Sequence, residues 1–211
     1  MTREEAVAAI EVGIQYVSEL KEKGYGIFAT GEMGIGNTTT SSAIASVLLD
    51  VEPEIVTGRG AGLSTEGLNR KVEVIRQAIS LHKPQKDDAI DVLAKVGGFD
   101  IAGLVGVFLG GAANRVPVVV DGFISAVAAL VAVRICPAVS DYILASHVSK
   151  EPAGMMLLDA LGKKPALTCD MCLGEGTGAV ALFPLLEMGL HIYQRMSTFE
   201  EIDLENYVPL T

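Results

Sequence analysis

The sequence predicts an α/β protein with a Rossmann-like three-layer fold, in which a mostly parallel sheet carries helices on both faces. Short segments rich in β-branched residues alternate with longer segments of helical periodicity, and glycine-rich turns follow the short segments. This alternation is typical of βαβ units. The 211 residues are enough for one large core. We therefore expect a single α/β domain over 1–211, with helix 2–23 and the tail 197–211 packing as accessory helical elements.

The first half of the chain predicts one short strand among several helices. Thr2 and Glu5 have the spacing of a capping box at the start of the first helix, and Gly24 ends it. A short buried strand at 25–30 runs into a glycine-rich turn, after which Asn37 is expected to cap the next helix. From their apolar spacing, the expected helices of this half span 2–23, 38–49, 64–82, 87–95 and 101–113.

The second half alternates more regularly. Its expected strands span 116–120, 142–145 and 166–171, and its expected helices span 123–134, 152–161 and 177–196. In parallel sheets, ligands collect at the carboxyl ends of the strands. The turns that follow the strands are therefore the expected place of a functional site.

Composition and charge argue against several classes of partner. The net charge of −10 disfavours nucleic acid or an anionic membrane surface as the main partner. The longest apolar runs, 101–113 and 122–133, are shorter than the roughly 18 residues that a membrane span needs. We expect no membrane span, and interpret both runs as helices of a core or of a homodimer interface. The first turns lack a secretory signal and the cysteine count of 3 is odd, so we expect a cytoplasmic location.

Cys169 and Cys172 form a Cys-x-x-Cys pair. A structural zinc normally takes four ligands, and no second cysteine pair stands at a suitable spacing. A thioredoxin-like redox pair is the other functional interpretation, and the usual surroundings of that motif are missing. Because free cysteines are often interior, we expect buried or half-buried thiols here, and we predict no metal site.

The first glycine-rich turn reads Gly-Glu-Met-Gly-Ile-Gly-Asn-Thr-Thr-Thr at 31–40. Glycines allow a backbone to approach a ligand closely, and the free amides of a helix start attract an anion. The turn is not a Walker A loop, and its G-x-x-G-x-G spacing differs from the G-x-G-x-x-G of dinucleotide-binding folds. A tight connection without a ligand is the plain alternative. Glu32 favours a site in which this acid contacts a ribose or a developing cation.

A second such turn, Leu-Gly-Glu-Gly-Thr-Gly at 173–178, places Glu175 between Gly174 and Gly176. Without bulky neighbours, this carboxylate is accessible to a flat ligand. A single motif of this kind would more often be a surface turn with an idle acid. Several glycine turns on the same side of the sheet make a shared site the better interpretation.

Further candidates lie in other turns. Asp121 follows the strand 116–120, where it is either a ligand-contacting acid or the N-cap of the next helix. Lys71 and Arg59 are the nearest cations, and either is equally consistent with a solvated side chain. His147, beside Ser146 in a polar loop, has no identified partner, so a structural role is the simpler interpretation.

Taken in order, these segments resemble the nicotinate-nucleotide:dimethylbenzimidazole phosphoribosyltransferase family over about residues 2–196. The resemblance implies transfer of phosphoribose from nicotinate mononucleotide to 5,6-dimethylbenzimidazole, which yields α-ribazole 5′-phosphate and nicotinate during assembly of the cobalamin lower ligand. It rests on the turns 31–39, 58–62 (Gly-Arg-Gly-Ala-Gly), 121–123 (Asp-Gly-Phe), 146–147 (Ser-His) and 173–179.

By this resemblance Glu175 matches the family's general base. The ring nitrogen of nicotinate mononucleotide is already cationic and leaves as a neutral group, so no cofactor and no Mg²⁺ are expected. One carboxylate that accepts the acceptor's ring proton contributes about 10²–10⁴-fold in rate. Glu32 and Asp121 are candidates for stabilising positive charge at C1′. The expected substrate-binding residues are Glu32, Gly34, Gly36, Asn37, Arg59, Gly60, Lys71, Asp121, Ser146, Gly174 and Gly176.

Family members carry a further N-terminal region that helps to form the benzimidazole pocket. We therefore expect this chain to match the C-terminal large domain, with the nucleotide half-site present and the base pocket incomplete. Another azole or a purine stays open as the acceptor. Two other functions stay open: a non-catalytic nucleotide-binding domain that needs a partner chain, and a nicotinamide-cofactor oxidoreductase, which the glycine order disfavours.

Overall fold

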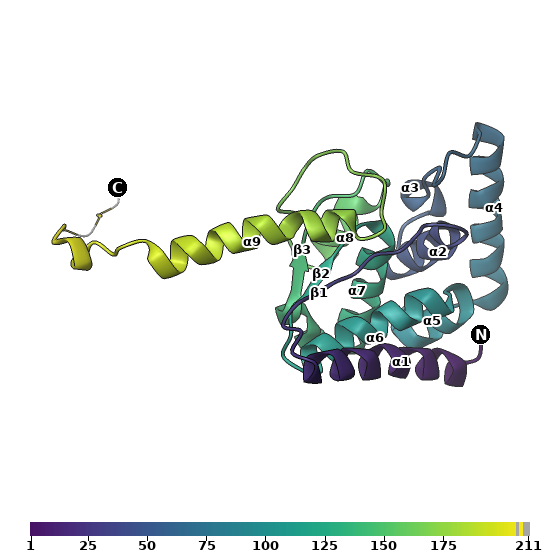
Figure 1. Cartoon of the computed structure of the whole chain (residues 1–211). Coiled ribbons are helices and arrows are strands. Elements are labelled where there is room, and N and C mark those ends of the chain that lie inside the picture. Colours follow the sequence, from purple (N-terminus) through teal and green to yellow (C-terminus); the bar gives the residue numbers. More distant parts are fainter. Residues whose placement is uncertain (206, 209–211) are drawn as a thin grey trace.

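The computed structural model describes residues 1–205 and 207–208 (Figure 1). A small parallel sheet lies at its centre, with β1 (Phe28–Ala29), β2 (Val118–Val120) and β3 (Ile143–Ala145) in the order β1-β2-β3. Phe28 pairs with Val118, which in turn pairs with Ile143. The carboxyl ends of all three strands therefore lie at one edge of the sheet.

One face of this sheet carries the main hydrophobic core. Val118 and Val120 belong to this core together with side chains of α6 (Phe99–Ala113) and α7 (Phe123–Ile135). The core residues of α7 come from all round the helix, and most of them are fully buried. The apolar run that follows β2 is thus a core helix, one of the two alternatives that its composition allowed.

The opposite face of the sheet is covered by α9 (Thr177–Arg195). Val119, whose side chain points the other way from its strand neighbours, packs there against Ala179 and Leu182. The predicted α/β class with a parallel sheet is therefore confirmed.

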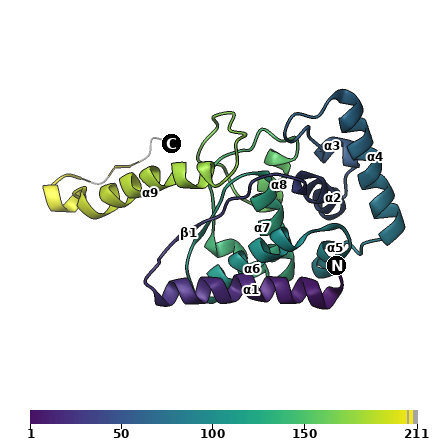
Figure 2. The same ribbon diagram turned by 45° about the vertical axis from the view of Figure 1, so that its right-hand side comes forward.

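The N-terminal helix α1 (Arg3–Glu22) packs closely along α6 (Figures 1 and 2). The expected capping box forms between Thr2 and Glu5. A Cβ added at Gly106 would lie 2.0 Å from the Ile10 carbonyl oxygen, so only glycine lets the two helix backbones approach this far.

The remaining α-helices pack around the core on the side opposite the one from which α9 projects (Figure 2). They are α2 (Asn37–Leu49), α3 (Pro53–Val56), α4 (Thr65–His82), α5 (Ala89–Val96) and α8 (Gly154–Ala160). Of the 3-10 turns in the described part of the chain, Pro137–Tyr142 lies between α7 and β3, and Glu200–Ile202 lies beyond α9.

Three expectations about elements are wrong in detail. The strand expected at 25–30 is shortened to Phe28–Ala29, and the strand expected at 116–120 is shortened to Val118–Val120. The strand expected at 166–171 does not form, since Leu167 makes only an isolated bridge with His147. Asn37 does not cap α2, because Gly36 occupies the cap position and Asn37 is the first helical residue. The described part of the chain is mostly helical, with a smaller sheet than the sequence predicts.

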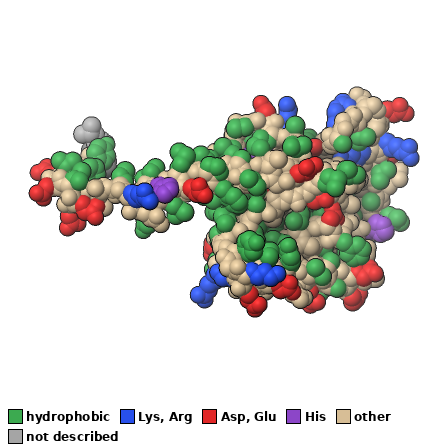
Figure 3. Space-filling model, in the orientation of Figure 1, with side chains coloured by type: hydrophobic (Ala, Val, Ile, Leu, Met, Phe, Trp, Pro, Cys, Tyr) green, Lys and Arg blue, Asp and Glu red, His purple; other side chains and the backbone are tan. Residues whose placement is uncertain are grey.

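Beyond its first turns, α9 projects away from the body of the protein, and the chain continues along the same arm (Figure 1). Figure 3 shows hydrophobic side chains exposed along this arm. Of the expected accessory tail 197–211, the described part contains one 3-10 turn, whereas residues 206 and 209–211 lie outside the described residues. None of the helices in the described part of the chain combines the length and apolar character needed to cross a membrane.

Candidate functional site

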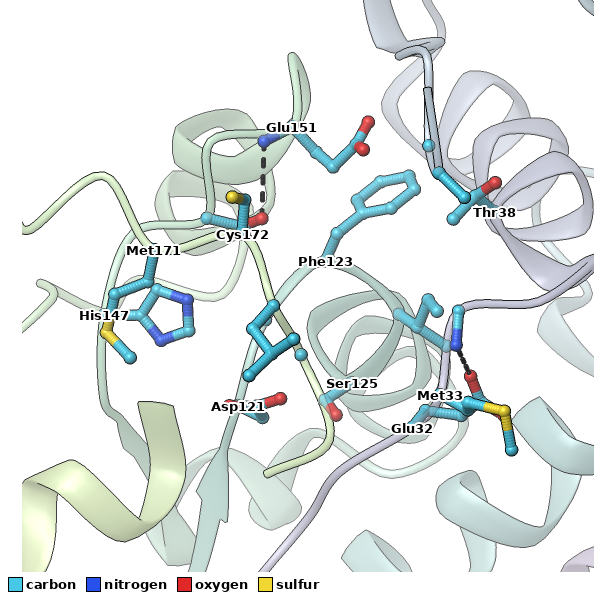
Figure 4. Close-up of a pocket in the computed structure, with 18 residues that line it drawn as sticks. Glu32, Met33, Thr38, Asp121, Phe123, Ser125, His147, Glu151, Met171 and Cys172 are labelled. Atoms are coloured by element: carbon cyan, nitrogen blue, oxygen red, sulfur yellow. Dashed lines mark hydrogen bonds between the residues drawn. The ribbon is translucent and has the colours of Figure 1, made fainter. Parts of the chain in front are cut away.

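A cavity of about 160 Å³ opens at the carboxyl edge of the sheet (Figure 4). Segments far apart in the sequence meet there: the turn after β1, the turns after β2 and β3, and the loop before α9. Its polar and acidic lining residues include Glu32, Thr38, Asp121, Ser125, His147, Ser149 and Glu151. The prediction that the glycine turns gather at this edge is confirmed.

The first glycine turn bends back on itself around Glu32. The Glu32 carboxylate accepts a hydrogen bond from the backbone N–H of Gly34, and both line the cavity. Gly34 and Gly36 each have a φ of 84°, a left-handed conformation that favours glycine. The Asn37 side chain points away from this turn and donates to Asp100 at 2.7 Å. Its predicted place in the site is therefore not supported by its contacts.

Lys71, a buried residue of α4, lies just outside the cavity. Its ammonium group donates to Thr38 Oγ1 at 2.9 Å and to the Gly58 carbonyl at 3.0 Å. Burial lowers the pKa of Lys71 below its ordinary value, and the neighbouring Glu151 carboxylate opposes this shift. Its Nζ would lie 3.8 Å from a Cβ added at Gly60, which lines the cavity. Gly60, which has no side chain, is therefore the main residue between this buried cation and the cavity.

Arg59, the other predicted cation, turns outward. Its guanidinium donates to the Leu63 carbonyl at 2.8 Å and to Thr65 Oγ1 at 3.1 Å, and the residue is exposed. These hydrogen bonds of Arg59 connect the second glycine turn to the start of α4. The structure does not bring Arg59 to the cavity.

Asp121 is the most heavily hydrogen-bonded acid of the site. Its carboxylate accepts backbone N–H bonds from Gly176 at 3.0 Å, from Gly178 at 2.8 Å and from Ala179 at 3.1 Å. These are free amides of the first turn of α9, which attract a negative charge. Of the two roles that the sequence left open for Asp121, the cap of the helix after β2 does not occur, because Gly122 holds that position. Asp121 instead caps α9, across 55 residues of sequence.

Ser146 fixes the proton on the His147 ring. The Ser146 hydroxyl lies 2.5 Å from the Val120 carbonyl, and its single proton is donated there. Ser146 Oγ therefore accepts from His147 Nδ1, 3.1 Å away, and this assigns the proton to Nδ1 and leaves the Nε2 lone pair free. Burial lowers the pKa of His147, with Asp121 opposing the shift, and this favours the neutral ring. His147 lines the cavity, whereas Ser146 is buried behind it.

Glu175 lies outside the cavity, in an adjoining shallow hollow. Its backbone has a φ of 57°, and its N–H donates to the Glu32 carbonyl at 2.9 Å. The side chain is exposed and lines the hollow together with Val180. Glu32 and Met33 line both spaces, so the cavity and the hollow meet at these two residues. The site thus has two adjoining compartments, with Glu175 in the more open one.

Sequence reasoning missed several lining residues, among them Thr38, Phe123 and Glu151. Two of these residues could have been found from their place in the sequence. Phe123 directly follows Asp121-Gly, and Glu151 ends the polar loop after β3. The cysteines were also misjudged: Cys136, Cys169 and Cys172 are all exposed, and Cys172 lines the cavity. Within the described residues, no cluster of three or more His, Cys, Asp or Glu side chains is arranged to hold a metal ion.

The arrangement suits a small anionic ligand that is transformed next to an accessible base. A buried lysine and left-handed glycine turns offer donors to an anion, and acids line the space beside them. Together with the parallel sheet, these features are typical of the class of α/β proteins that bind nucleotide-like ligands at the carboxyl edge of the strands.

The comparisons with known proteins agree with this class. A family model described as phosphoribosyltransferase matches residues 1–203, and the chain belongs to that family. It is 53% identical over 209 residues to the nicotinate-nucleotide–dimethylbenzimidazole phosphoribosyltransferase of Acetivibrio thermocellus, covering 99% of this chain and 60% of that protein. The protein of the same name from Clostridium acetobutylicum is 52% identical over 210 residues, with 100% and 60% covered.

A solved structure, described as CobT from Thermus thermophilus, has a TM-score of 0.91 to this chain at 38% identity. The match covers 98% of this chain and 62% of that one. The chain thus spans about 60% of the length of the curated relatives it matches.

Proposed function

We propose that this chain carries the nucleotide site and the general base for phosphoribosyl transfer from nicotinate mononucleotide to 5,6-dimethylbenzimidazole. The products are α-ribazole 5′-phosphate, a precursor of the cobalamin lower ligand, and nicotinate. The single observation that carries this proposal is the pair of adjoining compartments that share Glu32 and Met33. In this reaction the nucleotide and the acceptor must meet at C1′ of the ribose. The two compartments adjoin at Glu32 and Met33, so each substrate can occupy one of them.

The enclosed cavity suits the nucleotide. Lys71 and the backbone N–H groups at the start of α2, which no side chain caps, offer charge and donors for its phosphate. The hollow beside Glu175 suits the flat acceptor, because Met33 and Val180 give it apolar walls. The helices on both faces of the parallel sheet, which we describe as a Rossmann-like three-layer arrangement, support this placement at the strand ends.

The chemistry requires one base and no acid. The acceptor nitrogen attacks C1′, the bond from C1′ to the cationic pyridine nitrogen breaks, and nicotinate leaves with that electron pair. The acceptor's ring proton passes to the Glu175 carboxylate, a general-base contribution of about 10²–10⁴-fold. Glu32, at the junction of the compartments, stabilises positive charge that develops at C1′. Asp121 has three N–H partners already and acts by holding the start of α9.

The assembly that we propose is a homodimer in the cytoplasm. The projecting arm exposes large apolar side chains that a second copy would bury. They include Leu185, Met188, Leu190, Ile192, Tyr193 and Met196.

The proposal is tested by chromatographic detection of α-ribazole 5′-phosphate. The chain is incubated with both substrates, alone and with the part of the Acetivibrio thermocellus relative that the match leaves uncovered. We expect little product from the chain alone and clear product from the mixture. Binding of nicotinate mononucleotide without product in either sample would instead support a non-catalytic nucleotide-binding domain.

A further inference from the structure

Glu151 is an acid of the cavity that the proposed reaction does not use. Its Oε2 atom is buried and has no hydrogen-bond partner among the described residues. A buried carboxylate oxygen without a donor is costly, and such atoms are rare in native proteins. Glu151 also lines the cavity, and within the described residues its carboxylate accepts no hydrogen bond, so it is available to a donor on a bound ligand.

The position of this carboxylate is fixed by its surroundings. The Glu151 backbone N–H donates to Ser149 Oγ at 3.3 Å, and its carbonyl accepts from Gly154 at 2.9 Å at the start of α8. A Cβ added at Gly58 would lie 1.8 Å from Oε2, so this part of the second glycine turn leaves room for the carboxylate. Figure 4 shows the side chain extending toward Thr38, above Phe123.

The charges nearby decide which donor fits. Lys71 binds Thr38 and Gly58, which leaves one of its three N–H groups free in the described contacts. A phosphate is attracted to that cation and repelled by Glu151, so the phosphate does not supply a donor to the Glu151 carboxylate. Neutral hydroxyl groups do, and a nucleotide carries two of them on its ribose within a few ångströms of its phosphate. Acids hydrogen-bonded to ribose hydroxyls are a recurrent device of α/β nucleotide sites.

We propose that Glu151 accepts hydrogen bonds from the ribose 2′- or 3′-hydroxyl of the bound nucleotide and makes the site selective for ribonucleotides over deoxyribonucleotides. The assignment rests on the proposed function. It makes Glu151 a specificity-determining residue that acts on nucleotide binding, separate from the transfer chemistry at Glu175.

A binding cycle tests the assignment. Calorimetry measures the affinity of nicotinate mononucleotide and of its 2′-deoxy and 3′-deoxy analogues for the unchanged chain, Glu151→Ala and Glu151→Gln. A hydrogen bond to a charged group is worth enough for about a 10- to 100-fold loss of affinity when the hydroxyl is removed. We expect that loss for one analogue in the unchanged chain, little or none in Glu151→Ala, and an intermediate loss in Glu151→Gln.

The control is Glu66→Gln, an exposed acid in the first turn of α4, which should keep the discrimination of the unchanged chain. Both Glu151 variants also remove the negative charge beside the buried Lys71, so both should melt at a somewhat lower temperature, and affinities are compared at a temperature where each variant is folded. If both deoxy analogues bind as well as the ribonucleotide, or lose equal affinity in the unchanged chain and in Glu151→Ala, the assignment is wrong. Failure of nicotinate mononucleotide to bind any form would overturn the proposed function and this assignment with it.

Discussion

The Asp121 carboxylate, at the end of β2, accepts a 2.8 Å hydrogen bond from the backbone N–H of Gly178 in the first turn of α9. With the bonds from Gly176 and Ala179, it fastens the sheet to the turn that carries Glu175. Glu175, the proposed base, is thus held by main-chain contacts of its neighbours, while its own side chain stays exposed. This explains how an open surface turn can keep a carboxylate in a defined place.

Asp121→Asn should therefore slow the reaction through Glu175. Asparagine replaces one carboxylate oxygen with an NH₂ group, which cannot accept a hydrogen bond from the backbone N–H groups that Asp121 binds. Losing hydrogen bonds to a buried charge costs about 1.5–3 kcal/mol. We expect a lower melting temperature and a kcat reduced by at least tenfold, with the KM for the nucleotide nearly unchanged. Asp141→Asn, at an exposed position, is the control. An unaltered kcat would show that the Glu175 turn does not depend on this cap.

Gly178→Ala should destabilise the protein although alanine favours helices. Its Cβ would lie 1.9 Å from His147 Nδ1 and 2.9 Å from Asp121 Oδ1, so the ring or the helix must move. We expect a loss of about 1–3 kcal/mol in the free energy of unfolding. Gly189→Ala, on the same helix with no atom near its Cβ, should instead stabilise by up to about 1 kcal/mol. Equal effects of the two substitutions in urea unfolding would contradict the close packing of His147 on α9.

His147 should make the protein less stable in acid. Burial lowers the pKa of its ring below the ordinary value of 6.5, and the attraction of Asp121 only partly opposes this. As the pH falls through 6.5 toward the folded-state pKa, the unfolded chain takes up a proton that the folded chain does not, so the free energy of unfolding decreases.

In His147→Gln this contribution is absent. The difference between the two proteins in urea unfolding should therefore change between pH 8 and pH 5, with the unchanged chain losing more stability. A difference that stays constant over this range would mean that the ring titrates normally.

Lys71→Met should weaken binding of the nucleotide through its phosphate. Methionine keeps much of the buried volume and removes the cation that donates to Thr38 and Gly58. We expect affinity for nicotinate mononucleotide to fall by about tenfold or more, and affinity for nicotinate riboside, which has no phosphate, to change little. Lys164→Met, an exposed lysine, should alter neither. An equal loss for both ligands would place the phosphate elsewhere.

The sequence was most informative where structure depends on near neighbours. The capping box of Thr2 and Glu5, and the helix that begins after Ser64, follow from residues three positions apart, and both are present. The first glycine turn was placed correctly after a strand, β1, whereas the turn 58–62 follows α3 and the turn 173–178 follows a segment that forms no strand.

The features that were missed depend on distant segments. For Asp121 the sequence offered ligand contact or a cap on its own helix, yet its hydrogen-bond partners lie 55 to 58 residues further along the chain. The segment 166–171 runs beside the loop after β3 and bonds to it only at Leu167 and Met171, which is too sparse for a strand. No sequence pattern indicates that Glu151 Oε2 is buried without a hydrogen-bond partner. Its environment forms only where the start of α8, the second glycine turn and Lys71 come together in the fold.

The most direct test of the central claim is the kcat of Glu175→Gln, measured as α-ribazole 5′-phosphate formation in the active mixture. Glutamine keeps the shape of the turn and removes the proton acceptor, so turnover should fall by about 10²–10⁴-fold while nicotinate mononucleotide binds as before. Glu187→Gln, exposed further along α9, should retain full turnover. An unchanged kcat in Glu175→Gln would contradict the assignment of Glu175 as the general base.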